Sequence, residues 1–233
     1  MAGSASPRSA RVAVVLAGCG VYDGSEITEA VATLVSLSRA GAQVTCFAPD
    51  KQGFHVIDHT KGEPIEPARN VMLESARITR GKITPLSELK AAEFSALIVP
   101  GGFGAAKNLC NHATVAQGDP AKLDIDADLT NSLKAFHAAG KPIGMCCIAP
   151  VMAAAVLKCE VTVGRPVGDK WPFGGTAGAI ENYGGKHVAT DIDGVHVDTE
   201  NKVVTSAAYM YDGEPHEIFD SVGKMVEEVL KLA

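Results

Sequence analysis

The chain has 233 residues, a net charge of −6 and 46% apolar residues. This size fits one large domain, because single cores rarely grow beyond about 250–300 residues. The negative charge, without any cluster of Lys and Arg, argues against nucleic-acid binding. No apolar run approaches the roughly 20 residues of a membrane helix, so we expect no membrane partner. The six cysteines show no paired CxxC spacing, so we expect reduced thiols in an intracellular compartment and no metal site.

Buried strands alternate with amphipathic helices along the chain. Residues 11–17 (RVAVVLA) are typical of a buried strand, and Ser25 is the expected N-cap of a helix that ends at Gly41. Further strands are expected at residues 42–47, 95–100, 142–146 and 202–206, and further helices at residues 70–78, 105–110, 122–139, 151–157 and 215–232. This order predicts an α/β fold: a single-domain flavodoxin-like or Rossmann-like sandwich with a mostly parallel sheet and helices on both faces.

Two stretches depart from this alternation. Residues 51–82 are expected to hold short strands and one helix, and residues 111–122 are polar and irregular. Loops carry most binding and catalytic residues in folds of this class. We therefore expect these two segments to form lids over a site or contacts between subunits.

One cysteine stands at the junction of a predicted strand and a predicted helix. Within residues 141–150 (KPIGMCCIAP), the strand ends at Cys146, and Ala149 is small enough for the turn after Cys147 to close. This is the geometry of a nucleophile elbow, which presents its side chain at the carboxyl edge of the sheet. Amide groups at the start of the next helix favour a thiolate. We expect a reactive Cys147 with a lowered pKa, and a packing role for Cys146.

Glycines follow the neighbouring strand. Gly101 and Gly102 come directly after residues 95–100 (SALIVP), where the absence of a side chain lets the backbone approach a ligand. The N–H groups of Gly102 and Ile148 are therefore candidate donors to an oxyanion formed beside Cys147. An ordinary glycine-rich turn is the alternative explanation for this segment.

Three motifs in this order resemble one known family. They are residues 18–26 (GCGVYDGSE), 100–109 (PGGFGAAKNL) and 141–150 (KPIGMCCIAP). Together they resemble the ES1 family, a branch of the DJ-1/PfpI superfamily that is related to class I glutamine amidotransferases. The similarity extends over residues 11–232. Residues 164–185, which include Lys-Trp-Pro, are similar to the animal branch, whose members resemble mitochondrial proteins.

The resemblance implies a domain, a location and an assembly. It places a DJ-1/PfpI-like domain over residues 11–233. Residues 1–10 contain Ser, Ala, Pro and Arg but no acid, which is typical of a transit-peptide remnant or of a disordered tail. We therefore expect a mitochondrial location, with the cytoplasm as the alternative. Relatives of this kind also imply a homodimer or a higher homo-oligomer.

The superfamily's site residues fall on particular positions of this chain. Its elbow cysteine falls on Cys147, and its oxyanion donors fall on Gly102 and Ile148. It also places a glutamate of the first helix against the sulfur, which falls on Glu29, with Glu26 one turn earlier as the alternative. Burial would raise the pKa of such a carboxyl, so that it shares a proton with the thiol. Compensation of the helix dipole is the alternative role of either glutamate.

One departure from the superfamily limits the chemistry. The superfamily usually carries a histidine one strand past the elbow helix, and that position here is Gly164. Hydrolysis by a Cys–His pair is therefore a weaker expectation. His216 and Glu217 are similar to the His and Glu pair of amidotransferases, but they stand at a helix start, where we expect a solvated face. His59 lies in the first irregular segment and is a weak candidate for substrate contact.

The function expected first is that of a glyoxalase- or deglycase-like enzyme. It would act on small reactive carbonyl compounds through Cys147, with neither a metal nor an organic cofactor. A non-enzymatic redox sensor or binding protein with a reactive cysteine is the first alternative. A glutaminase-like amidohydrolase is the second.

A nucleotide site is a further alternative from the residues themselves. Gly18, Gly20 and Gly24 after the first strand, with Asp50 after the second, form a loose version of the dinucleotide fingerprint. The spacing differs from GxGxxG, and Asp23 places a negative charge where a pyrophosphate would lie. We therefore rank nucleotide binding below the cysteine chemistry.

Overall fold

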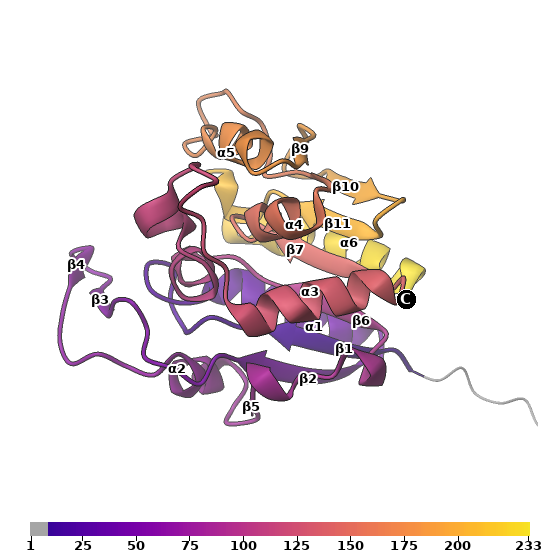
Figure 1. Cartoon of the computed structure of the whole chain (residues 1–233), viewed down its shortest axis with the longest axis horizontal. Helices are drawn as coiled ribbons and strands as arrows, with labels where there is room; N and C mark the ends of the chain where they lie inside the picture. Colours follow the sequence, from indigo (N-terminus) through magenta and orange to yellow (C-terminus); the bar gives the residue numbers. More distant parts are fainter. Residues whose placement is uncertain (1–8) are drawn as a thin grey trace, which may run out of the picture.

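A seven-stranded sheet forms the centre of the molecule (Figure 1). The computed structural model describes residues 9–233, so most of the tail expected over residues 1–10 lies outside the described residues. The strands are β1 (Arg11–Val15), β2 (Gln43–Ala48), β3 (Ile57–Asp58), β4 (Glu63–Pro64), β5 (Thr84–Pro85), β6 (Ala96–Val99), β7 (Ile143–Cys146), β8 (Glu160–Val161), β9 (Lys186–His187), β10 (Val195–Asp198) and β11 (Val203–Ser206). The helices are α1 (Ile27–Arg39), α2 (Val71–Ile78), α3 (Ala127–Ala138), α4 (Pro150–Leu157), α5 (Thr176–Asn182) and α6 (Pro215–Leu232). Short 3₁₀ or π turns lie at Leu86–Glu88, Ala91–Glu93, Ala105–Leu109, His112–Ala116 and Ala208–Met210.

The strand order places a crevice at the carboxyl edge of the sheet. The order is β10-β11-β7-β6-β1-β2-β5, and every neighbouring pair is parallel except β10 with β11. The chain runs from β1 outward to β2 and β5 and then returns to β6 on the other side of β1. Such a switch in direction is where open α/β sheets bind ligands. The expected α/β fold with a mostly parallel sheet is thus confirmed.

Helices cover both faces of this sheet. α1 and α6 pack against each other on one face, and α3 and α4 lie together on the other (Figure 1). The buried residues of α6 recur every three or four positions and turn one apolar stripe toward β7 and β11. Gly144 in β7 makes this close packing possible, because a Cβ there would lie 2.7 Å from the Val229 side chain.

Two helix starts differ from the sequence prediction. α1 is capped by Glu26, whose carboxylate accepts the Glu29 N–H at 2.8 Å, so the prediction of Ser25 as the cap is wrong. The buried Ser25 hydroxyl instead accepts the Ala17 N–H at 2.9 Å and fastens the loop that follows β1. α3 begins later than residue 122, because Asp126 accepts the first N–H groups of that helix.

The two irregular segments take different places in the molecule. Residues 51–82 include α2 and the β3–β4 hairpin, which projects from the side of the sheet (Figure 1). Residues 111–122 begin with the π turn His112–Ala116, which forms part of a cavity wall described below. Only the second segment therefore lies over the carboxyl edge of β7.

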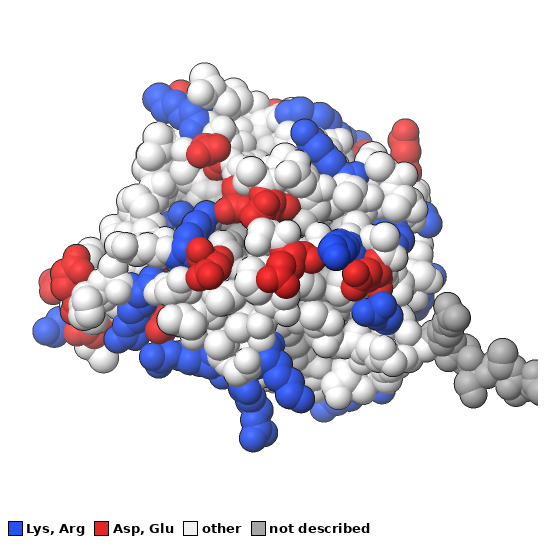
Figure 2. Space-filling view, turned by 60° about the horizontal axis from the view of Figure 1, so that its bottom comes forward, with Lys and Arg blue, Asp and Glu red and all other residues white. Residues whose placement is uncertain are grey.

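Acidic and basic side chains are interspersed on the face that Figure 2 shows. A surface of mixed sign produces little long-range field for steering a charged partner. Within residues 9–233, none of the helices combines the length and the apolar character needed to cross a bilayer.

Candidate active site

Cys147 occupies a strained turn between β7 and α4. Its φ is +58°, in the left-handed region that a residue with a side chain adopts at a cost of about 1–2 kcal/mol. Two backbone hydrogen bonds of 3.1 Å hold the turn, from the Cys147 N–H to the Ser206 carbonyl and from the Ala149 N–H to the Cys146 carbonyl. The structure therefore gives Cys147 the elbow conformation expected from the sequence.

Glu29 lies directly behind this turn and is completely buried. Its Oε2 accepts the Gly101 N–H at 2.9 Å, and its Oε1 accepts the Tyr209 N–H at 3.3 Å. The Cys147 thiol lies close enough to this carboxyl group for each to shift the pKa of the other. Glu26, the alternative candidate, caps α1 and lines the neighbouring cavity. Of the two glutamates, Glu29 is thus the one that raises the pKa of the Cys147 thiol.

Cys146 shares the same carboxyl group. Its side chain is completely buried, and its Sγ donates to Oε2 of Glu29 at 3.6 Å. The sequence suggested only a packing role for this residue. Two adjacent thiols therefore face one carboxyl group, although only Cys147 also lines the cavity.

Burial determines the direction in which the pKa values of Glu29 and Cys147 shift. Desolvation raises the pKa of Glu29 to about 7, and the nearby charge of Glu26 acts in the same direction. Burial and the charge of Glu29 raise the pKa of the Cys147 thiol well above its ordinary value. Hydrogen bonds from the N–H groups of Gly102 and Ile148 lower that pKa but do not offset the burial. The expectation of a lowered thiol pKa is therefore wrong, and the resting sulfur holds its proton.

The glycine turn after β6 leaves room for this arrangement. A Cβ at Gly101 would lie 2.5 Å from the Cys147 Cβ and 2.9 Å from Oε2 of Glu29. Gly102 has a φ of +96°, and a Cβ there would overlap the backbone at Glu26. A side chain at Gly101 would therefore separate the carboxyl group from the thiol, and one at Gly102 would displace the loop before α1.

A cavity of about 680 Å³ opens in front of Cys147. It lies between the loops that follow β1 and β6, the π turn His112–Ala116 and the start of α5. Its walls are formed by Val21, Tyr22, Glu26, Gly102, Phe103, His112, Ala113, Gln117, Cys147, Ile148, Pro172, Phe173, Gly175, Thr176, Ala179, Tyr209 and Met210. The segment 51–82 contributes none of these residues.

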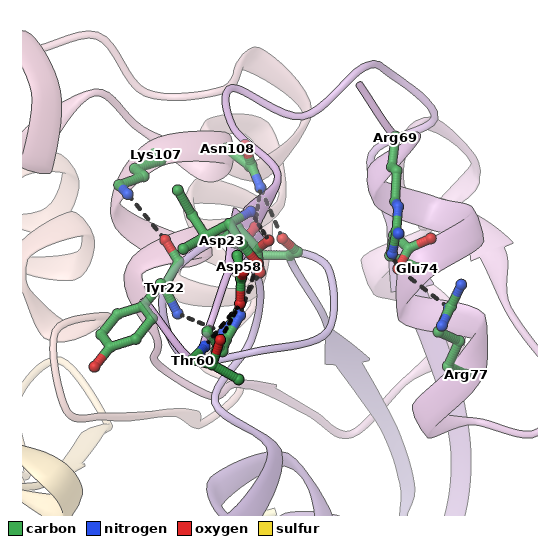
Figure 3. A network of polar contacts seen from close by, with 12 residues as sticks. Tyr22, Asp23, Asp58, Thr60, Arg69, Glu74, Arg77, Lys107 and Asn108 are labelled. Carbon is green, nitrogen blue, oxygen red and sulfur yellow. Dashed lines mark hydrogen bonds and ion pairs between the residues drawn. The ribbon is translucent and has the colours of Figure 1, made fainter. Parts of the chain in front are cut away.

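A polar network fixes the loop that carries Tyr22 to the rim of this cavity (Figure 3). The Lys107 ammonium donates to the Tyr22 carbonyl at 2.9 Å, and the Tyr22 N–H donates to Nε2 of His59 at 3.2 Å. Asp23 accepts the Ile57 N–H at 2.7 Å and so ties the loop to the hairpin segment. His59 therefore supports the rim from behind and does not line the cavity.

The same packing argues against a dinucleotide site in this loop. A Cβ at Gly20 would lie 2.7 Å from the His59 ring, so the glycine accommodates a side chain of the protein. Asp50 accepts a hydrogen bond from the Asn70 amide at 2.8 Å. The residues of the loose fingerprint are thus engaged in holding the loop and the 51–82 segment together.

A histidine that the sequence did not single out stands in the cavity wall. His112 contacts the Tyr183 hydroxyl through Nδ1 at 2.8 Å, and this hydroxyl also accepts the Gly118 N–H at 2.9 Å. Burial lowers the pKa of His112. The only sequence signal for a role of His112 was its place in the irregular segment 111–122. Its partner Tyr183 lies 71 positions away, so no local pattern indicates their contact.

The position of the superfamily's histidine is filled differently here. Gly164 has a φ of +93°, and any side chain at this position would overlap the ring of Trp171. Trp171 is nearly buried and packs beside Tyr211 with 4.9 Å between ring centroids. Glu217, part of the alternative His and Glu pair, accepts the Glu214 N–H at 2.8 Å and caps α6.

Comparison with known proteins defines the class. The model of the DJ-1/PfpI family matches residues 10–212, and the chain belongs to this family. It is 56% identical to the rat (Rattus norvegicus) ES1 protein homolog, mitochondrial, over 98% of this chain and 86% of that protein. It is also 56% identical to the human (Homo sapiens) glutamine amidotransferase-like class 1 domain-containing protein 3, mitochondrial, over 96% of this chain and 84% of that protein.

These relatives place the chain in the ES1 branch of animal mitochondrial proteins, and their names confirm the expected mitochondrial location. Among solved structures, an isoprenoid biosynthesis protein with an amidotransferase-like domain from Ehrlichia chaffeensis has a TM-score of 0.86 at 33% identity. That similarity covers 96% of this chain and 99% of the bacterial one. DJ-1beta of Drosophila melanogaster, with a TM-score of 0.53 at 19% identity, shares the fold.

The raised pKa of Glu29 predicts a pH-dependent stability. The folded chain holds this proton up to a pH of about 7, whereas the unfolded chain releases it near the ordinary value of 4.5. Stability is therefore expected to fall as the pH rises from about 4.5 to about 7, by about 3 kcal/mol. Urea unfolding across this range, with Glu29→Gln as the control, measures the effect. An equal slope in the variant would contradict the assignment.

The contact between Gly164 and Trp171 predicts a coupled pair of positions. Gly164→Ala should destabilise the fold by about 2–4 kcal/mol, because it combines overpacking with left-handed strain. In a Trp171→Ala background the same change should cost less. Gly178→Ala in α5 is the control, because a Cβ there meets nothing within 4 Å. Additive effects of the two substitutions in thermal unfolding would show that the two positions are independent.

Proposed function

We propose that this protein is a glyoxalase- or deglycase-like enzyme that acts on reactive carbonyl compounds through Cys147. The observation that carries the proposal is the proximity of a cavity-lining thiol to a buried carboxyl group whose pKa is about 7. A base with a pKa near the working pH combines a useful ionised fraction with enough basicity to accept a proton. A carbonyl compound in the cavity would therefore meet a nucleophile that has a base directly behind it, together with two amide donors.

The first step is addition of the sulfur to an aldehyde carbon. The S–C bond forms while the thiol proton passes to the Glu29 carboxylate, so that no free thiolate is needed in the buried site. The carbonyl π electrons move to oxygen. The N–H groups of Gly102 and Ile148, which face the sulfur before reaction, are placed to stabilise the resulting oxyanion. Transfer of the proton from Glu29 to this oxygen gives a hemithioacetal and regenerates the Glu29 carboxylate.

The second step moves hydrogen between adjacent carbons. Glu29 removes the proton from the carbon bonded to sulfur, and an enediol forms with the neighbouring carbonyl group. Return of the proton to that neighbouring carbon gives a thioester, and water then releases a 2-hydroxy acid and the thiol. One carbon is oxidised and its neighbour is reduced, so the sum is addition of one water to a 2-oxoaldehyde. The electrons balance within the substrate.

Two alternatives fit the site less well. A redox sensor requires an accessible cysteine of low pKa, whereas burial raises the pKa of Cys147. A glutaminase needs groups that bind a zwitterion, and the described lining of the cavity contains neither Lys nor Arg. The histidine usual in such an enzyme is also replaced by Gly164.

The homodimer or higher homo-oligomer expected from the resemblance stays a prediction.

Removal of the nucleophile tests the proposal directly. Cys147→Ser should lower kcat/KM for 2-oxoaldehydes by more than about a hundredfold, because the sulfur forms the covalent intermediate. Cys159→Ala removes another buried thiol outside the cavity and is the matched control. Production of the 2-hydroxy acid, measured by chromatography, excludes simple trapping of the aldehyde. Full turnover by folded Cys147→Ser would overturn the proposal.

The role of Glu29 predicts the pH profile of turnover. Because the carboxylate must be ionised to accept the thiol proton, kcat/KM should rise with pH to a plateau, with a midpoint of about 7. Glu29→Gln should abolish this rise along with most of the activity. Glu26→Gln should move the midpoint to lower pH, because it removes a charge that raises the pKa of Glu29. An unmoved midpoint would assign the titration to another group.

A further inference from the structure

The cavity is large for a three-carbon substrate. Its volume of about 680 Å³ lies within the range of about 300–1,000 Å³ that is usual for pockets holding drug-sized ligands. A molecule such as methylglyoxal would occupy a small part of this space. The remaining wall would stay in contact with water. The size of the cavity therefore points to a ligand with a substantial body beyond its reacting carbons.

The outer wall is formed mainly by aromatic rings. Phe103 lies between Tyr22 and Phe173, with 6.5 Å and 6.4 Å between the ring centroids. Tyr22 and Phe173 are 40% and 43% exposed, which leaves apolar surface uncovered in the free protein. Ile148 continues this surface to the cysteine turn. An apolar body that extends from Cys147 toward the rim would cover this apolar surface. Removal of the surface from water would stabilise the bound ligand.

The charges of the wall disfavour an anion. Among the described residues that line the cavity there is no Lys or Arg, whereas the carboxyl group of Glu26 is present. The ammonium group of Lys107 donates to the Tyr22 carbonyl and lies over the Phe103 ring, 5.4 Å from its centroid. A carboxylate or phosphate on the ligand would thus be desolvated without a counter-charge.

The cavity wall also contains a neutral polar side chain, that of His112. Because the Tyr183 hydroxyl accepts the Gly118 N–H, its own proton is free to point to Nδ1 of His112. This arrangement favours the tautomer with the proton on Nε2, a nitrogen that makes no hydrogen bond within residues 9–233. Burial lowers the pKa of His112 and so keeps the ring uncharged.

We propose that this cavity binds an uncharged 2-oxoaldehyde with an aromatic or branched apolar body, which lies against Tyr22, Phe103 and Phe173 while its dicarbonyl end meets Cys147. The proposal rests on the carbonyl chemistry proposed above and narrows it to a substrate class. Its chemical step is unchanged: sulfur adds to the aldehyde, and one water is consumed for each 2-hydroxy acid released.

Three aldehydes that differ in size and charge test the substrate class by steady-state kinetics. We expect kcat/KM for phenylglyoxal to exceed that for methylglyoxal by at least about tenfold, as added apolar contact in a pocket allows. 4-Carboxyphenylglyoxal, which matches phenylglyoxal in shape but carries a charge, should fall below phenylglyoxal by at least the same factor. Equal values for phenylglyoxal and methylglyoxal, with activity still dependent on Cys147, would overturn the substrate class and leave the proposed function standing.

Two phenylalanine variants distinguish recognition by the cavity from differences in the intrinsic reactivity of the probes. Phe173→Ala should reduce the ratio of the phenylglyoxal value to the methylglyoxal value by about tenfold. Phe54→Ala, which removes a similarly exposed ring outside this cavity, should leave the ratio unchanged. A ratio that is the same in wild type and Phe173→Ala would show that the aromatic wall does not recognise the substrate.

A binding measurement keeps the substrate class testable without turnover. The fluorescence of Trp171, the one tryptophan of the chain, reports on the adjacent wall residue Pro172. In Cys147→Ser, titration with acetophenone should saturate, and titration with the charged 4-acetylbenzoate should not. If wild type turns over no aldehyde, the proposed function fails, but this preference would still support the class of ligand. Absence of saturable binding by acetophenone would overturn it.

Discussion

The buried carboxyl group of Glu29 is the interaction on which the site depends. It joins the first helix to the turn after β6 through Gly101 and to the segment after β11 through Tyr209. These parts lie far apart in the sequence, and the carboxyl group reaches the two thiols only where they meet. Each hydrogen bond offsets part of the cost of burying a polar group. The strained elbow brings Cys147 beside this carboxyl group, and the absence of a side chain at Gly101 leaves room for both.

Burial gives the thiol and the carboxyl group of this site different roles. A thiol in an apolar setting keeps its proton, while a carboxyl group in the same setting becomes a stronger base, because water is excluded from both. The pair therefore suits chemistry in which the proton leaves as the substrate arrives. The apolar cavity outside Cys147 preserves that setting, and a ligand that fills it would exclude further water.

The fold and the elbow were accessible from the sequence because their signals are local. A buried apolar run, a Gly–Gly turn and a Cys–Ile–Ala–Pro segment each specify their own backbone. The helix cap was mistaken because Ser25 is a good cap by type but is needed to bind Ala17. The upward shift of the Cys147 pKa could not be predicted, because it depends on burial by segments that are distant in the sequence. His112 acquires its role from Tyr183, 71 positions away, which no local pattern indicates.

The contact of Trp171 with Gly164 determines which residues this chain can accept at the position where the superfamily resemblance implies a histidine. A histidine placed at Gly164 would collide with the indole ring, and loss of the ring alone would leave a void beside the cavity. Each single change is thus expected to give a less stable protein, and a histidine at this position requires two substitutions together. In this chain, an ordinary packing contact therefore excludes a histidine from the position that Cys–His chemistry would use.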